Sequence, residues 1–335
     1  MIKHSLSRLT AAADLLRPKT FFRTLSRVDA LADRTRQLTE QVAELREQNE
    51  QLITIQRLDW EMRDEFASLS EALDAKRIGA HVRRAIESAT LEMDPFPHVV
   101  VENWLPTDIY KHLIAAIPPP VFFTDRENGR HRVSVPFTFG PAYSRMVWDF
   151  MYRTLVARIL NRALNAKFQD AVRDYVRSVC PALPADADIR LHASDGRIML
   201  RHRGYNLLPH RDPRWGFMTV LIYLAREGDA EAYGTRLYRV RDDAGAPDSR
   251  VYYIDPERCD LVKTVPFRAN SMLVFLNSTG AHAASIPEDA PADVERYFYQ
   301  FRLGPSPAVL RQMLSLMTPE QATLWAGAKA DRAGG

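Results

Sequence analysis

Short runs of β-forming residues, with no helical period between them, fill the sequence from residue 188 to residue 303. The runs cover 188–193, 197–203, 217–224, 234–240, 251–254, 260–267, 271–277 and 295–303. About eight short strands in succession are typical of a β-sandwich or a jelly-roll barrel, whose interior can hold a small site. Helical patterns flank the series, at about 142–178 and after Pro305. The sequence therefore predicts an α+β fold with a β-barrel core.

Two candidate metal ligands come just before the run from Phe217 to Leu224. His210 and Asp212 are two residues apart. On an extended backbone, residues i and i+2 point to the same side, so an imidazole and a carboxylate can face one point here. A lone His-x-Asp triplet is a weak signal, because such triplets are frequent by chance. A metal site therefore needs a third ligand further along the chain.

The third candidate ligand is His282, which follows the apolar strand pattern from Ser271 to Leu276. Two histidines and one carboxylate form the facial arrangement that suits non-haem Fe(II) and O2 chemistry. The final strand pattern places Arg296 and Arg302 on one face. An inward guanidinium is costly unless it meets an anion, ideally a carboxylate bound through two hydrogen bonds. An oxo-acid cosubstrate with a distal carboxylate would satisfy it.

These residues resemble, in their order along the chain, the 2-oxoglutarate- and Fe(II)-dependent oxygenases, and within them the prolyl-4-hydroxylase-like branch. The segment 94–101 (DPFPHVVV) is similar to the family's opening strand, and Tyr205 with His210-Arg211-Asp212 to the strand that carries its metal motif. The segment 234–238 (GTRLY) resembles the strand that follows, and 270–275 the strand before the distal histidine. The resemblance covers roughly residues 94–304.

What the resemblance implies is a double-stranded β-helix (jelly roll) with flanking helices, which uses Fe(II), 2-oxoglutarate and O2 and releases succinate and CO2. It implies His210, Asp212 and His282 as the metal ligands. It implies Arg296, together with Tyr205, as cosubstrate-binding residues. Arg302 is a rival for the anchoring role, because the spacing from His282 to Arg296 is longer than in many members. The expected reaction is hydroxylation of a small-molecule or peptidyl substrate.

Two other interpretations stay open. The first is a catalytically inactive jelly roll that acts as a binding or scaffolding module at the end of a coiled coil. The second is a cupin-like metal enzyme with a different reaction, such as an isomerase. A His-x-Asp start, in place of the cupin His-x-His start, speaks against the second.

A long helical segment precedes the oxygenase-like region. Residues 28–76 contain no Pro and no Gly, and apolar residues recur at the a and d positions of heptads. The first phase comprises Val28, Leu31, Leu38, Val42, Leu45 and Leu52, with Asn49 at an a position, and the second continues through Ile55, Met62, Phe66, Leu69 and Leu73. The pattern predicts a coiled coil that makes the protein a homo-oligomer, and Asn49 favours a parallel dimer. A helix folded back on its own domain would show the same polar face.

The predicted domains are therefore a basic arm (1–27), a coiled-coil helix (28–78) and an oxygenase domain (79–335) with its jelly-roll core at about 188–303. The arm combines basic residues with leucines and phenylalanines. We favour a frayed basic terminus, with a weak contact to an anionic membrane surface as the alternative. The formal net charge of +3 is too small to indicate nucleic acid as a partner.

The sequence also bears on the compartment. Cys180 and Cys259 are the two cysteines, too few for a disulfide framework, so we expect a reducing, cytoplasmic environment. No run approaches the ~18 apolar residues of a transmembrane helix. The N-terminus shows no uninterrupted apolar stretch with a cleavage site, so we expect no signal peptide.

Overall fold

The computed structural model describes residues 18–127, 131–134, 136–184, 186–194, 196–213, 215–243 and 252–322. The chain divides into two compact units, Met1–Arg57 and Leu58–Gly335. Most of the predicted basic arm, residues 1–17, lies outside the described residues. The described part of the first unit is one helix, α2 (Pro18–Glu61). The last four residues of this helix, from Leu58 on, belong to the second unit. A single helix is the expected outcome for a stretch without Pro or Gly.

The long helix is shorter than the predicted segment 28–78. It ends at Glu61, and the chain continues in α3 (Arg63–Ala72) and α4 (Ala75–Ser88). Asp74 caps α4 by accepting hydrogen bonds from the backbone N–H groups of Lys76 and Arg77. Leu69, from the second heptad phase, is fully buried in the core of the second unit. Its heptad position therefore reflects packing on its own domain.

The remaining helices lie in the second unit, and four of them follow one another from Ala142 to Val179 with only Phe168 outside a helix, so the predicted helical stretch at about 142–178 is present. They are α5 (Thr107–Ala115), α6 (Ala142–Phe150), the π-helix η2 (Met151–Leu160), α7 (Asn161–Lys167), α8 (Gln169–Val179) and α9 (Pro307–Leu316), with short 3-10 turns η1 (Pro120–Phe122), η3 (Glu231–Tyr233) and η4 (Pro256–Arg258). Among the described residues, no helix is both long enough and apolar enough to cross a membrane.

Two antiparallel sheets form the centre of the second unit. The larger sheet has the order β1-β11-β7-β13-β5-β3-β2, with β4 paired to β13, and the smaller one β10-β8-β12-β6-β9. The strands of the larger sheet are β1 (His98–Glu102), β2 (Phe123–Glu127), β3 (His131–Ser134), β4 (Leu191–Ala193), β5 (Arg197–Arg201), β7 (Met218–Tyr223), β11 (Ser271–Leu276) and β13 (Arg296–Pro305). Those of the smaller sheet are β6 (Asn206–Arg211), β8 (Thr235–Val240), β9 (Tyr252–Tyr253), β10 (Cys259–Val265) and β12 (Ala281–Ser285).

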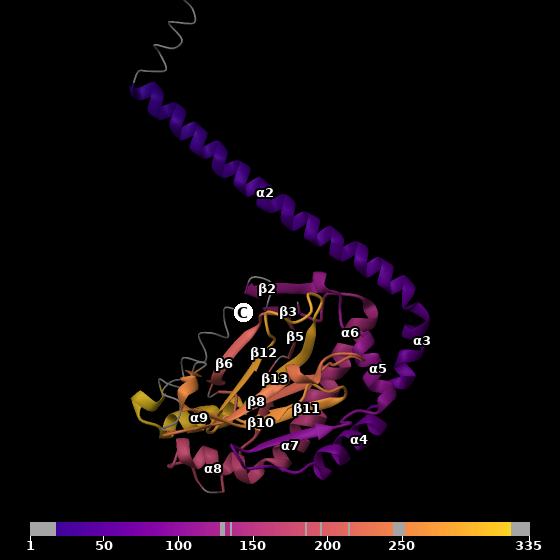
Figure 1. The fold of residues 1–335 in the computed structure, drawn as a ribbon, viewed down its shortest axis with the longest axis vertical. Helices are drawn as coiled ribbons and strands as arrows, with labels where there is room; N and C mark the ends of the chain where they lie inside the picture. The colour runs from indigo at the N-terminus through magenta and orange to yellow at the C-terminus, as the bar shows by residue number, and fades with distance from the viewer. Residues whose placement is uncertain are drawn as a thin grey trace, which may run out of the picture. The chain divides into compact units, whose positions relative to one another are not determined.

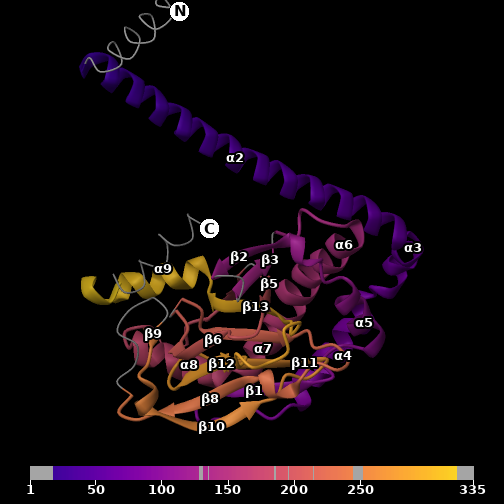
Figure 2. The same ribbon diagram turned by 45° about the horizontal axis from the view of Figure 1, so that its top comes forward.

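The strand order is that of a double-stranded β-helix. From β5 to β8 the chain alternates between the larger and the smaller sheet, β9 and β10 remain in the smaller one, and β11 to β13 alternate again. Strands β8, β10 and β12 of the smaller sheet lie side by side in Figures 1 and 2. The predicted α+β fold with a jelly-roll core is thus confirmed.

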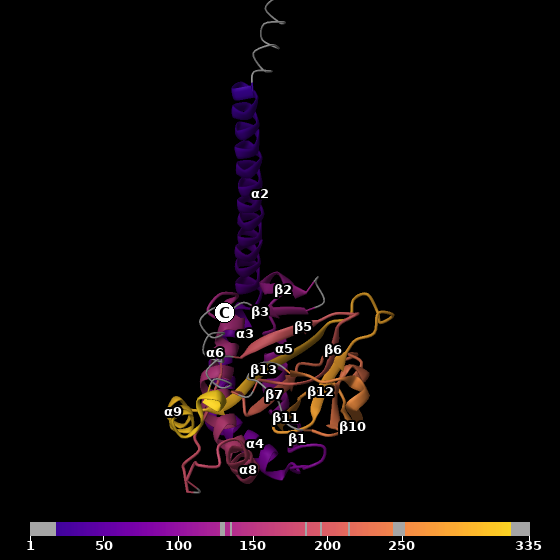
Figure 3. The ribbon, with the colours of Figure 1, turned by 90° about the vertical axis from the view of Figure 1, so that its left-hand side faces the viewer.

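The larger sheet lies between a layer of helices and the smaller sheet, as Figure 3 shows. Its strands β7 and β11 are buried at every position, which explains why the sequence shows them as continuous apolar runs. One core packs α6, η2 and α8 against the outer face of the sheet. A second core fills the space between the sheets and contains Phe96, Phe267, Phe275 and Phe298. The predicted ligands border this second core.

Two strands of the smaller sheet, β6 and β12, were absent from the strand series read from the β-forming residues, and only the family resemblance placed a strand at β6. Pro209 interrupts the β pattern of β6, and β12 consists largely of alanines, which are depleted in strands. In the sheet, β12 lies between β6 and β8. These two strands carry the histidines of the candidate site.

Candidate metal centre

His210 and His282 lie opposite each other on neighbouring strands. His282 in β12 is the register partner of His210 in β6, and their ring centroids are 4.1 Å apart. Asp212 follows β6 directly, and its two carboxylate oxygens lie 3.9 Å from His210 Nε2 and 3.9 Å from His282 Nε2. One ligand atom from each residue lies within 4.8 Å of the others, and all three side chains are buried.

An ion pair between the buried Arg211 and the half-buried Asp243 fixes the ends of the two strands to each other. Arg211 donates from Nη2 to Asp243 Oδ2 at 2.6 Å and to the carbonyl of Gly280 at 2.9 Å. The N–H of Gly280 donates to the same carboxylate oxygen at 2.8 Å. Gly280 has a positive φ of 67°, which glycine adopts without strain, and it turns the chain into β12. The turn before His282 is thereby held at the end of His210's strand.

The surroundings of His210 and His282 favour the neutral form of both imidazoles. The carbonyl of Leu208 lies 2.9 Å from His210 Nδ1, which assigns the proton to that atom and leaves Nε2 directed at Asp212. Burial lowers the pKa of His210, and burial together with the neighbouring His210 lowers the pKa of His282 to about 3. Neutral imidazoles are the form that binds metals. Two neutral nitrogens and one carboxylate oxygen thus fit a divalent metal ion, and they are the donor set expected for Fe(II).

Asp212 is held by Thr219 and Asn277, which the sequence did not single out, and by Arg302, which it offered as a rival anchor for the cosubstrate. Thr219 Oγ1 donates to Asp212 Oδ2, and Asn277 Nδ2 donates to Thr219 Oγ1 at 3.0 Å. Arg302 Nη2 donates to Asp212 Oδ1 at 3.0 Å. Burial by itself would raise the pKa of the Asp212 carboxyl, but Arg302, the two histidines and Thr219 together keep it well below its usual range. The one feature of the sequence that could have indicated this contact is Thr219, a threonine inside the otherwise apolar run of β7.

The fold is a double-stranded β-helix, and His210, Asp212 and His282 form a buried triad of candidate metal ligands inside it. The sequence resemblance to these enzymes thus agrees with the strand order and with the meeting of His210, Asp212 and His282. No family model matches the sequence, and no curated protein matches it.

Several solved structures are similar to this chain. A prolyl hydroxylase from Trichoplax adhaerens, in complex with a hypoxia inducible factor peptide, is 10% identical (TM-score 0.38, 70% of this chain and 92% of that chain covered). HygX from Streptomyces hygroscopicus, with nickel, 2-oxoglutarate and hygromycin B bound, is 15% identical (TM-score 0.38, 63% of this chain and 83% of that chain covered). A prolyl-4-hydroxylase from Pseudomonas putida is 14% identical (TM-score 0.36, 67% of this chain and 99% of that chain covered). It is this chain's own strand order and triad that identify the fold.

Arg296 lies at the start of β13 and points into the space between the sheets. It is 2% exposed, and its guanidinium carbon lies 4.6 Å from the ring centroid of Phe298, 5.1 Å from Phe267 and 5.6 Å from Tyr223. Its one hydrogen bond among the described residues goes to Thr235 Oγ1, at 3.5 Å. Burial lowers the pKa of Arg296 to about 10, so it stays a cation at neutral pH. A buried cation without a carboxylate partner is the kind of group that a bound anion stabilises.

Tyr205, the other residue implied in cosubstrate binding, lies at the turn between β5 and β6. It is buried and packs with Ala284, Ile286 and Ala290. Its ring lies 4.7 Å from the guanidinium carbon of Arg201. The structure therefore brings Tyr205 towards the arginine end of the barrel interior and not to the triad.

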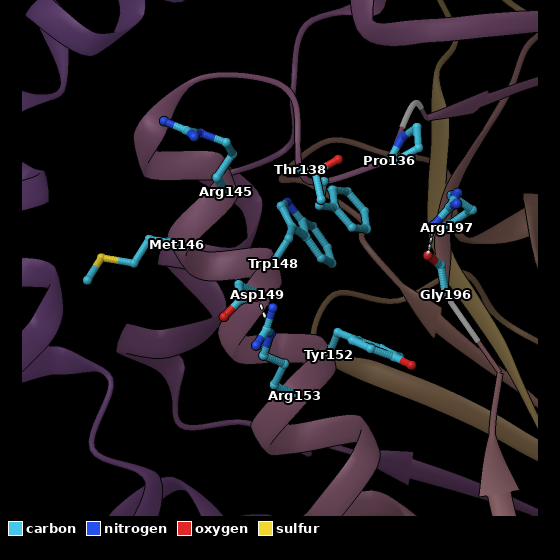
Figure 4. A pocket seen from close by; sticks show the side chains of 11 residues that line it. Pro136, Thr138, Arg145, Met146, Trp148, Asp149, Tyr152, Arg153, Gly196 and Arg197 are labelled. Atoms are coloured by element: carbon cyan, nitrogen blue, oxygen red, sulfur yellow. Dashed lines mark hydrogen bonds and ion pairs between the residues drawn. The ribbon is translucent and has the colours of Figure 1, made fainter.

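A separate pocket of about 790 Å³ opens beside the start of β5 (Figure 4). It is bounded by Gly196 and Arg197 on one side and by Trp148 and Tyr152 on the other. Phe137 stacks on Trp148, with ring centroids 5.1 Å apart and planes 13° apart. The described residues that line this pocket include no member of the triad and neither Arg296 nor Tyr205, so it is not the predicted site.

Proposed function

We propose that this protein is a non-haem Fe(II)- and 2-oxoglutarate-dependent dioxygenase that hydroxylates its substrate and releases succinate and CO2. The observation that carries the proposal is the combination of two features in one barrel interior. The first is a buried metal-ligand triad, and the second is a buried arginine, Arg296, that has no carboxylate partner among the described residues.

The spacing between these features supports a short keto acid as cosubstrate. Thr235, which contacts Arg296, lies two residues from Leu237 along β8, and Leu237 is the register partner of His282. Two residues of a strand span roughly 7 Å. A small molecule can therefore reach from the triad to Arg296. In 2-oxoglutarate the keto-acid group would lie at the triad and the distal carboxylate at Arg296.

The triad, Arg296 and the apolar residues around them have separate roles in the proposed reaction. Bound by His210, Asp212 and His282, Fe(II) would supply the O2 chemistry that couples decarboxylation of 2-oxoglutarate to oxidation of the substrate. As three protein ligands, His210, Asp212 and His282 would leave the metal able to bind further ligands. Arg296 binds and orients the cosubstrate through its distal carboxylate. Phe275 and Leu237, buried between the sheets, keep water from the same space.

The test is turnover of the cosubstrate in the absence of a known substrate. We expect the purified protein with Fe(II) and O2 to convert 2-oxoglutarate slowly to succinate, measured by mass spectrometry, and to bind Mn(II) as an inert substitute, measured by calorimetry. Product analysis after incubation with candidate substrate pools would then identify the hydroxylated compound. A protein that binds neither the metal nor 2-oxoglutarate would instead be an inactive binding module.

We also propose that the protein forms a homo-oligomer through residues 28–76. The support comes from the a and d residues Leu31, Leu38, Val42, Leu45 and Leu52, which are 46–64% exposed on the single chain. A helix that leaves such a stripe open to water gains by pairing it with a second copy.

Acidic substitutions on this stripe are expected to separate the oligomer. Leu38→Asp combined with Leu45→Asp places charges at two d positions, and sedimentation velocity should show a monomer where the wild-type protein is a dimer or larger. Gln37→Asp combined with Ala43→Asp adds the same number of acids on the exposed side of the same helix and should leave the oligomer intact. A monomeric wild-type protein would contradict the proposal.

A further inference from the structure

Arg201 is a second buried arginine beside Arg296. The two residues are direct register partners in the antiparallel pair of β5 and β13. Arg201 is 3% exposed and Arg296 is 2% exposed. Residues directly opposite in such a pair lie on the same face of the sheet, with their Cβ atoms about 5 Å apart. Both side chains therefore start from the inner face of the barrel.

The two guanidinium groups lie around one ring. The guanidinium carbon of Arg201 is 5.2 Å from the ring centroid of Phe298, and that of Arg296 is 4.6 Å from it. Like charges directly opposite in a sheet destabilise it, and burial strengthens their repulsion. Burial lowers the pKa of Arg296, and the nearby positive charge of Arg201 lowers it further. An anion between the two groups would remove the repulsion.

The head group of Arg201 is held in place before any ligand arrives. Its Nη1 donates to the carbonyl of Arg132 at 3.2 Å and to the carbonyl of Leu200 at 3.1 Å. The ring of Tyr205 covers it at 4.7 Å. A donor fixed in this way loses little conformational freedom on binding, so more of its interaction energy appears as affinity.

We propose that Arg201 and Arg296 bind the same carboxylate, the distal carboxylate of 2-oxoglutarate, from two sides. The inference rests on the proposed function and adds a residue to it. A carboxylate has two oxygens and accepts several charge-assisted hydrogen bonds at once, which matches two guanidinium groups that approach from neighbouring strands. Tyr205 then acts through Arg201, whose position it helps to fix.

The experiment measures 2-oxoglutarate affinity by calorimetry on the full-length Mn(II)-loaded protein. Arg201→Gln is expected to weaken binding by on the order of 10-fold or more, and Arg201→Lys by less. Arg203→Gln, two residues further on and exposed, is the matched control and should leave the affinity unchanged. Mn(II) affinity should be equal in all variants, which verifies that each one folds with its triad intact.

Two further measurements separate carboxylate binding from a purely structural role. The keto acid 2-oxopentanoate has no distal carboxylate, so Arg201→Gln should not change its affinity. The effects of Arg201→Gln and Arg296→Gln on 2-oxoglutarate should be less than multiplicative in the double variant, because both groups hold one carboxylate. If Arg296→Gln weakens binding and Arg201→Gln does not, the inference is wrong and the proposed function stands. If the wild-type protein binds no 2-oxoglutarate, the proposed function itself fails.

Discussion

Asp212→Ala is expected to abolish conversion of 2-oxoglutarate and to weaken Mn(II) binding by more than about 100-fold, since loss of a ligand's supporting hydrogen bonds alone costs roughly 10- to 100-fold. The carboxylate lies 3.9 Å from both imidazole nitrogens and provides the one negative charge of the triad. Its removal leaves two neutral nitrogens next to the cation of Arg302, an arrangement that repels a metal ion. Calorimetric titration with Mn(II) and a succinate assay measure the two effects.

Asp289→Ala is the matched control, because Asp289 is an exposed carboxylate in the turn after β12. It should bind Mn(II) and turn over like the wild-type protein. Circular dichroism of Asp212→Ala should show an intact fold, since Arg302 is 22% exposed and can reach water when its partner is removed. Wild-type turnover in Asp212→Ala would contradict the assignment of the metal site.

Arg296→Ala is expected to raise the 2-oxoglutarate concentration needed for half-maximal turnover by about 30-fold or more. Loss of one partner in a buried, charge-assisted contact costs about 2–5 kcal/mol. Mn(II) affinity should change little, because the contacts of Arg296 are with Thr235 and aromatic rings and not with the triad. The cosubstrate titration and the metal titration are made on the same variant.

Arg302→Ala provides the contrast on the same face of β13. Arg302 donates to Asp212 and lies over the ring of Trp215, at 5.3 Å from its centroid. Its loss should leave the affinity of the metal-loaded protein for 2-oxoglutarate nearly unchanged, because Arg302 is bound to Asp212 and not to the space around Arg296. The opposite ranking of the two arginine variants would show that Arg302 is the anchor.

The chemistry of the site could be predicted from the sequence because it depends on residue types and local spacing. His210 and Asp212 are two residues apart, so any extended backbone directs them together, and the apolar run after them predicts a buried strand. Arg296 and Arg302 are both present on one strand pattern, and alternation alone places them on one face. The strand series and the flanking helical patterns likewise predicted an α+β fold with a β-sandwich or jelly-roll core, and the family resemblance implied the jelly roll.

Local patterns could not give the contacts between distant strands. The pairing of β6 with β12, which sets His282 opposite His210, joins residues from a proline-containing strand and an alanine-rich one, neither of which has a strong β signal. The end of the long helix at Glu61 could not be predicted either. The heptad pattern continues through Leu69, and it looks the same whether Leu69 faces a second copy or, as in the structure, its own domain.

Residue types and local spacing show that this chain has two histidines, a carboxylate and arginines suited to such a site. Which of these groups meet depends on the fold, which brings together Arg302 with Asp212, Thr219 with the same carboxylate, and Arg201 with Arg296. These contacts depend on strand register, which is a long-range property. It is fixed when both faces of the larger sheet are packed, and a shift of one residue would turn every side chain of a strand to the opposite face.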